Sequence, residues 1–148
     1  MNVESFIDTN VFVYQLERID IRKANIADEL IEYGIQSQSA CISHQVIQEC
    51  VNTAVRKAEI PLTGDEMRKY IVDVLAPMYR IRPDIPLYLK SLDIQARYRF
   101  SFYDSLIVAA ALTAGCRTLY TEDLSDNQQI EDMTIVNPFS SKLSDRPN

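Results

Sequence analysis

Four acidic residues lie where their carboxylates could act together on one substrate. Asp8 ends a short apolar run, and Asp123 follows another, just after Tyr120. Asp104 lies in the first turn of a strongly apolar helix, and Glu49 lies on the polar face of a helix that follows a further apolar run. None of the four has a Lys or Arg directly beside it in the sequence. If they converge they repel one another, so a bound cation is expected between them.

The other potential ligands decide which cation fits. The chain has one histidine, His44, and three cysteines, Cys41, Cys50 and Cys116, at spacings that match no zinc motif and no disulfide framework. We interpret the cysteines as buried apolar residues in a reducing compartment. Oxygen ligands without His or Cys select Mg²⁺ or Mn²⁺, which activate bound water and neutralise charge on a phosphodiester. The acids therefore suggest metal-dependent hydrolysis of phosphodiester bonds.

Each acid also has a purely structural interpretation. Asp8 could cap a helix, and Asp104 could complement a helix dipole. Glu49 could be a solvated residue on a helix, and Asp123 could be an ordinary loop residue. We favour a shared site because all four are expected at one edge of the same sheet.

Apolar runs alternate with amphipathic segments along the chain, at separations too long for β-hairpins. This order predicts a mostly parallel sheet covered by helices on both faces, which is a three-layer α/β/α sandwich. Functional groups in such a sheet gather beyond the carboxyl ends of the strands, where Asp8 and Asp123 are expected. The predicted strands are 3–7, 40–42, 78–81, 116–120 and 133–136, and the predicted helices are 11–16, 21–35, 44–58, 63–75 with a capping box, 86–98 and 101–112.

The composition indicates one compact domain outside a membrane. The chain has 148 residues, 47% of them hydrophobic, and a formal net charge of −6. The longest apolar run, 106–112, is too short to span a bilayer, and the N-terminus lacks the basic residues of a secretory signal, so we expect a cytoplasmic protein. The negative charge argues against broad electrostatic capture of nucleic acid but not against a local basic patch. We predict one domain over residues 1–139 and a flexible polar tail over residues 140–148.

Four segments that contain the acids resemble the motifs of the PIN domain. Their sequences are FIDTNV at 6–11, ECVN at 49–52, FYDSLIVAAA at 102–111 and YTEDL at 120–124, followed by IVNPF at 135–139. PIN domains are metal-dependent ribonucleases with a parallel sheet, and many bacterial single-domain members are the toxins of VapBC toxin–antitoxin pairs. The resemblance implies an enzyme that cleaves RNA with Mg²⁺ or Mn²⁺, with a small antitoxin protein as partner and a homodimer as its assembly.

The resemblance also implies roles for individual residues. Asp8, Glu49, Asp104 and Asp123 match the metal-binding and catalytic positions, Asp126 is a candidate accessory acid, Thr9 and Asn10 would order the loop around Asp8, and Asn52 matches a polar position of the second motif. The apolar Ile and Leu residues of 21–35 and 63–75 are candidates for the contacts of the homodimer and the antitoxin.

A local basic segment precedes Asp104. Residues 97–103 alternate arginines with aromatic rings, so Arg97 and Arg99 are candidate RNA contacts. The alternative interpretation is that the rings are core residues and that the arginines only cover them.

Two other functions stay open. A catalytically silent module could keep the PIN fold and work only by binding a partner, although the retention of all four acids argues against it. A phosphatase of the haloacid-dehalogenase type also places an Asp after its first strand. That class needs a second acid two residues later, where this chain has Asn10.

Overall fold

The structure, a computed structural model, describes residues 3–57, 59–60 and 62–140. The predicted tail 140–148 lies outside the described residues, except for Ser140.

One sheet runs through the centre of the molecule. Its strand order is β3-β2-β1-β4-β6-β5, and every neighbouring pair is parallel except the antiparallel β5 and β6. This confirms the predicted mostly parallel sheet. The strands are β1 (Ser5–Ile7), β2 (Ala40–Ser43), β3 (Tyr79–Ile81), β4 (Thr118–Tyr120), β5 (Gln129–Ile130) and β6 (Met133–Val136).

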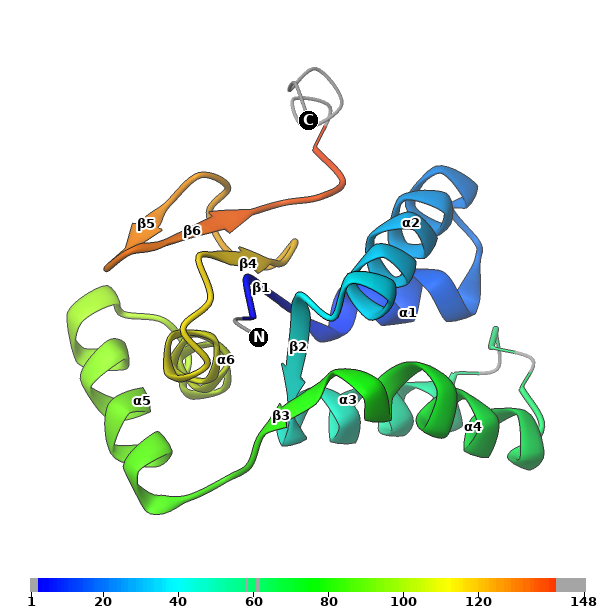
Figure 1. Ribbon diagram of the computed structural model, residues 1–148, viewed down its shortest axis with the longest axis horizontal. Coiled ribbons are helices and arrows are strands. Elements are labelled where there is room, and N and C mark those ends of the chain that lie inside the picture. Colours follow the sequence, from blue (N-terminus) through cyan, green and yellow to red (C-terminus); the bar gives the residue numbers. More distant parts are fainter. Residues whose placement is uncertain (1–2, 58, 61, 141–148) are drawn as a thin grey trace.

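Helices cover both faces of the sheet, as a three-layer sandwich requires. Figure 1 shows α5 and α6 on one side of the strands and α1 to α4 on the other. The helices are α1 (Thr9–Glu17), α2 (Ile21–Ser37), α3 (His44–Arg56), α4 (Gly64–Tyr70), α5 (Ile85–Tyr98) and α6 (Phe102–Thr113), and α4 continues into a π-helix (Ile71–Leu75) and a 3₁₀ turn (Ala76–Met78). Among the described residues, none of these helices has the length and apolar composition needed to cross a bilayer.

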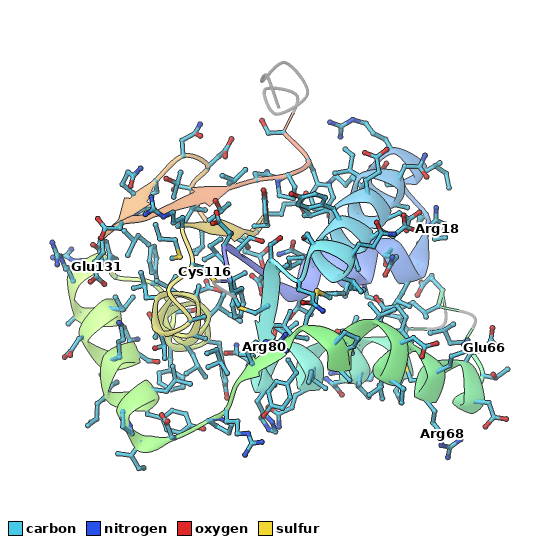
Figure 2. All side chains as sticks on the ribbon, viewed as in Figure 1. Arg18, Glu66, Arg68, Arg80, Cys116 and Glu131 are labelled. Atoms are coloured by element: carbon cyan, nitrogen blue, oxygen red, sulfur yellow. The ribbon has the colours of Figure 1, made fainter. Side chains whose placement is uncertain are left out.

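The core lies between the sheet and its two helical layers. Strand residues such as Ile7, Ile42 and Leu119 have no exposed surface, and the apolar run of α6 is buried from Leu106 to Ala111. The predicted burial of the cysteines is confirmed: Cys41, Cys50 and Cys116 are free and buried. Figure 2 shows Cys116 in the interior, whereas Arg18, Glu66 and Arg68 point outward from the helical layer of α1 to α4.

One local signal acted as the sequence predicts, and one helix end differs from the prediction. The capping box at the start of α4 is present: the Thr63 N–H donates to Glu66 Oε1 (2.9 Å), and the Glu66 N–H donates to Thr63 Oγ1 (3.1 Å). The helix predicted over 21–35 instead continues to Ser37. Gly34 serves a close approach there, because a Cβ on it would lie 2.6 Å from the Cβ of Ala40 in β2.

Candidate active site

Asp8 is the central residue of the candidate site and lies at the carboxyl end of β1. Its Oδ1 accepts the N–H of Thr9 (2.7 Å) and so caps α1, and its Oδ2 accepts the hydroxyl of Thr121 (2.9 Å). Only 5% of Asp8 is exposed. The strand therefore delivers a fixed, nearly buried carboxylate to the edge of the sheet where functional groups gather.

The surroundings of Asp8 disfavour its charged form. The pKa of Asp8 is raised from its ordinary 3.8 to about 7, chiefly by burial and to a lesser extent by the charges of Asp123 and Glu49. The hydrogen bonds from Thr9 and Thr121 act in the opposite direction. No Lys or Arg in the described part of the chain forms an ion pair with any of these three acids. Their negative charge is therefore uncompensated by the protein.

A second group of polar contacts brings Asp123 to this edge. The amide of Asn10 donates to Asp123 Oδ2 (3.1 Å) and to Thr121 Oγ1 (3.3 Å), and the N–H of Asp123 donates to the same hydroxyl oxygen (3.1 Å). Thr121 thus connects Asp8 to the loop after β4. The remaining amide oxygen of Asn10, Oδ1, is buried without a hydrogen-bond partner among the described residues.

Glu49 approaches from α3 on the other side of Asp8. The hydroxyl of Thr9 donates to Glu49 Oε2 (3.1 Å), and the side-chain amide of Gln45, one helical turn earlier, donates to Glu49 Oε1 (2.5 Å). The same Gln45 nitrogen donates to the carbonyl oxygen of Tyr103 (3.2 Å) at the start of α6. Gln45 therefore ties the Glu49 carboxylate to the helix turn that contains Asp104.

Asp104 belongs to that turn, but its carboxylate stands apart from the hydrogen-bonded acids. Its N–H donates to Ser101 Oγ (3.1 Å), so the cap of α6 fixes its backbone. Its side chain is half-buried and makes no hydrogen bond or ion pair within the part of the chain that the structure describes. Over residues 3–57, 59–60 and 62–140, no three His, Cys, Asp or Glu side chains stand close enough to enclose a metal ion as they are placed.

The donor set nevertheless suits a hard cation. Asp8, Glu49 and Asp123 offer oxygen ligands only, no basic side chain competes for them, and the Oδ1 of Asn10 is a further buried oxygen without a partner. Mg²⁺ and Mn²⁺ bind such oxygens and keep several waters, so they need few protein ligands. These residues fit the cation that the sequence predicts.

Comparison with known families assigns the fold. The model of the PIN domain matches residues 5–125. The chain belongs to the PIN-domain family. A comparison with curated proteins finds no significant match.

Solved structures share the fold of this PIN domain at low sequence identity. A chain of the DNA-bound VapBC from Salmonella typhimurium is 16% identical with a TM-score of 0.66, over 90% of this chain and 96% of that chain. A chain of a toxin–antitoxin complex from Klebsiella pneumoniae is 16% identical with a TM-score of 0.64, over 91% and 98%. Mycobacterium tuberculosis VapC20, described as a toxin that cleaves the sarcin–ricin loop, is 17% identical with a TM-score of 0.59, over 81% and 90%.

Other residues singled out in the sequence make no hydrogen bond or ion pair with the four acids within the described ranges. Asp126 accepts the N–H of Asn137 (2.9 Å), so it joins the loop after β4 to the end of β6. Asn52 is exposed on α3 and makes no side-chain hydrogen bond within the described ranges. Arg97 and Arg99 are exposed at the C-terminal end of α5, where Arg97 lies over the ring of Tyr98 at 5.4 Å.

Two residues of the site carry more contacts than the sequence motifs indicate. Gln45 holds Glu49, and Thr121 holds both Asp8 and the N–H of Asp123. A signal for Gln45 is its spacing of four residues from Glu49, which puts the two side chains on one helix face. A signal for Thr121 is its position directly after β4, where the strand reaches the same edge as β1.

Proposed function

We propose that this PIN domain is a metal-dependent endoribonuclease that hydrolyses RNA phosphodiester bonds as the toxin of a toxin–antitoxin pair. The observation that carries the proposal is the gathering of Asp8, Glu49 and Asp123 at one sheet edge, where none of them forms an ion pair with a described basic side chain. Membership of the PIN family supports it, as does the likeness to VapC20, which is described as an RNA-loop-cleaving toxin.

Three of the four candidate ligands, all but Asp104, have a neighbour that orients the carboxylate. The hydroxyl of Thr121 holds the Asp8 carboxylate, the amide of Gln45 holds Glu49, and the amide of Asn10 holds Asp123. Such fixed outer contacts set the direction of a ligating oxygen. Asp8, Glu49, Asp104 and Asp123 would hold Mg²⁺ or Mn²⁺, which when bound supplies a Lewis acid that activates water and stabilises charge on the phosphate.

A groove of about 380 Å³ runs past Glu49 and Asp123 and gives a substrate access to these two acids. It is lined by Thr9, Asn10, Glu49 and Asp123 together with Tyr14 and Lys57. The ammonium group of Lys57 is partly exposed and pairs with Glu17 (3.3 Å). We assign phosphate contacts to Lys57 at the groove, and RNA contacts outside it to Arg97 and Arg99.

We infer an antitoxin partner and a homodimer as well. Several structural neighbours are complexes of a toxin with its antitoxin. For the second copy, the best surface is the stripe of α5 formed by Ile85, Leu89 and Leu92, which are 51–69% exposed and share one helix face. The predicted segments 21–35 and 63–75 expose Ile21, Tyr33 and Val72, which are divided between two separate segments.

The decisive experiment is cleavage of an end-labelled unstructured RNA by the purified full chain. We expect cleavage with Mn²⁺ or Mg²⁺ and none with EDTA. Asp8→Asn and Asp104→Asn should lower the rate at least about 100-fold, because removing even residues that only orient metal ligands commonly costs 10–100-fold. The matched control Asp132→Asn removes an exposed acid of the β5–β6 turn and should cleave normally. Equal rates for wild type, Asp8→Asn and Asp104→Asn would refute the proposed site.

A further inference from the structure

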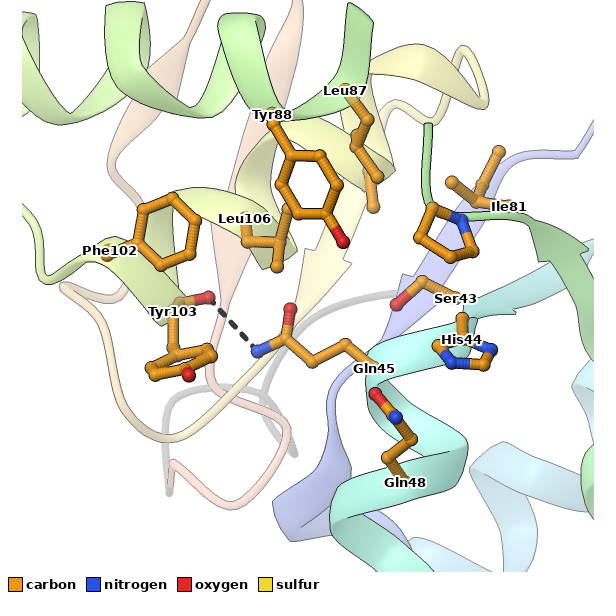
Figure 3. Close-up of a pocket in the computed structure, with 12 residues that line it drawn as sticks. Ser43, His44, Gln45, Gln48, Ile81, Leu87, Tyr88, Phe102, Tyr103 and Leu106 are labelled. Atoms are coloured by element: carbon orange, nitrogen blue, oxygen red, sulfur yellow. Dashed lines mark hydrogen bonds between the residues drawn. The ribbon is translucent and has the colours of Figure 1, made fainter. Parts of the chain in front are cut away.

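A separate pocket lies on the opposite side of Gln45 from the acids. It has a volume of about 260 Å³ and lies between the start of α3, the end of β3 and helices α5 and α6. Figure 3 shows the rings of Tyr88 and Phe102 and the side chains of Leu87 and Leu106 forming its apolar walls. Drug-sized ligands usually occupy about 300–1,000 Å³, so this pocket suits one ring system.

The floor of the pocket carries two polar atoms without partners. Ser43 is 3% exposed and Gln45 is 9% exposed, and Ser43 Oγ and Gln45 Oε1 form no hydrogen bond among the described residues. The orientation of the Gln45 amide is fixed, because its nitrogen faces two acceptors, Glu49 Oε1 and the carbonyl of Tyr103. Its oxygen therefore points into the pocket as an acceptor (Figure 3).

Such unpartnered atoms are unfavourable in a folded protein. A buried polar group that loses its hydrogen bonds to water costs about 1–3 kcal/mol. Ser43 precedes α3 as its N-cap residue, yet its hydroxyl makes no capping bond. The local fold therefore does not explain why these two atoms are buried without hydrogen bonds. A ligand that offers an N–H to Gln45 and a donor or acceptor to Ser43 would satisfy both.

The pocket is joined to the candidate active site through one side chain. The Gln45 amide forms the pocket floor with its oxygen and holds Glu49 with its nitrogen. Tyr103 lines the pocket directly before Asp104. A ligand in the pocket therefore lies next to a phosphodiester placed at the acids.

We propose that this pocket receives one unpaired nucleobase of the RNA that the active site cleaves. Every base has an N–H on its Watson–Crick edge for Gln45 Oε1, and a flat face for the rings of Tyr88 and Phe102. That edge is free only in single strands, loops and bulges. The inference rests on the proposed ribonuclease function and makes it specific for unpaired RNA.

The first test uses neutral nucleosides, because their binding requires neither metal nor cleavage. We would titrate adenosine, guanosine, cytidine and uridine into the ¹⁵N-labelled full chain in EDTA and follow the amide resonances. At least one nucleoside should shift the resonances around Ser43, Gln45 and Tyr103 in a saturable way. Tyr88→Ala should weaken that binding about tenfold, which is typical of a lost base–aromatic stack. The control Val55→Ala removes an exposed apolar side chain on α3 that does not line the pocket, and it should bind normally.

Ser43→Ala separates a recognition role from a structural one. It deletes an unsatisfied buried hydroxyl, so it should leave the melting temperature unchanged or raised while weakening nucleoside binding. The control Ser91→Ala removes a fully buried hydroxyl that donates to the Leu87 carbonyl (2.8 Å), and it should not affect binding. Normal nucleoside affinity in both Ser43→Ala and Tyr88→Ala would overturn the proposal.

The second test links the pocket to cleavage. With Mn²⁺, removing a single base next to the cut should slow the wild type about tenfold and leave Tyr88→Ala unaffected, because that variant has already lost the stack. If no abasic substitution changes the cleavage rate, the proposed role of the pocket is overturned, but the proposed ribonuclease function is not. Nucleoside binding without any RNA cleavage would refute the ribonuclease function while supporting the binding of a nucleobase in the pocket. A pocket that binds no nucleoside and is filled by an antitoxin side chain would overturn the proposal in favour of a protein ligand.

Discussion

Glu122 and Asp123 are neighbours in the sequence, but they have opposite electrostatic surroundings. Glu122 accepts the ammonium of Lys23 (2.6 Å) and the hydroxyl of Tyr14 (2.5 Å). Lys23 also lies 4.6 Å from the centre of the Tyr14 ring. Asp123 lines the same groove but is held by the neutral amide of Asn10.

The difference shows how the protein handles acids that serve the fold and acids that are kept for a ligand. The charge of Glu122 is neutralised by a cation from the protein, and the resulting cluster joins the loop after β4 to α1 and α2. Asp8, Glu49 and Asp123 are held only by hydroxyl, amide and backbone N–H groups. Neutral donors orient a carboxylate without cancelling its charge, so the negative potential remains available to a bound cation.

The largest predicted effect is the pH dependence of stability that Asp8 causes in the absence of metal. It tests whether the acids of the site lack a compensating charge. Because the pKa of Asp8 is about 7 in the folded state and 3.8 is its ordinary value, the native state holds the extra proton between these pH values. The free energy of unfolding should therefore fall as pH rises from about 4 to about 7, by up to about 4 kcal/mol. We expect urea unfolding in EDTA to show that decline in wild type and a smaller one in Asp8→Asn.

Asparagine is a suitable replacement because it retains the Oδ1 acceptor that caps α1. Asp132→Asn is the control and should keep the wild-type pH dependence. Identical pH profiles for wild type and Asp8→Asn would show that Asp8 ionises normally and that the acids do not act on one another.

A somewhat smaller effect is expected from metal binding. At a Mn²⁺ concentration about 100-fold above its dissociation constant, binding stabilises the native state by about 2.7 kcal/mol, which raises the melting temperature by about 5–10 °C. Asp8→Asn and Asp104→Asn should lose most of this gain. Glu122→Gln should retain it, because its carboxylate already has a protein partner. Equal Mn²⁺ shifts in all four proteins would place the ion elsewhere.

The smallest predicted effect is the loss of stability on replacing Glu122, the acid that is paired with Lys23. Glu122→Gln removes a half-buried ion pair and weakens the contact with Tyr14, so the free energy of unfolding should fall by about 1 kcal/mol. RNA cleavage should stay near the wild-type rate. Thermal melting and the cleavage assay measure the two properties separately. A collapse of cleavage with unchanged stability would mean that Glu122, and not only Asp123, belongs to the active site.

Features set by short stretches of the chain were predictable from the sequence. The capping box of Thr63 and Glu66 involves neighbouring residues, and the apolar run of α6 is buried all around. The alternation of strands and helices gave the parallel sheet, and the rule for its carboxyl edge placed Asp8 near Asp123. By contrast, β5 has only two residues and offers no periodicity to detect.

Features that depend on partners far along the chain were not predictable. Gly34 is required by Ala40, which approaches it only after α2 has packed on β2. Gln45 acquires its second acceptor from Tyr103, which is 58 residues away. Asp126 acquires a structural partner in the backbone N–H of Asn137, which is 11 residues away. In each case residue type indicates the capacity to bond, and only the fold supplies the partner.

The shared amide of Gln45 constrains how this protein could diversify or be engineered. Replacing Gln45 to alter which base is preferred would also release Glu49, so selectivity and turnover would change together at this position. Ser43 and Tyr88 touch the pocket without contacting a candidate metal ligand. Changes in the preferred RNA that keep the cleavage rate are therefore expected at Ser43 and Tyr88, with Gln45 retained.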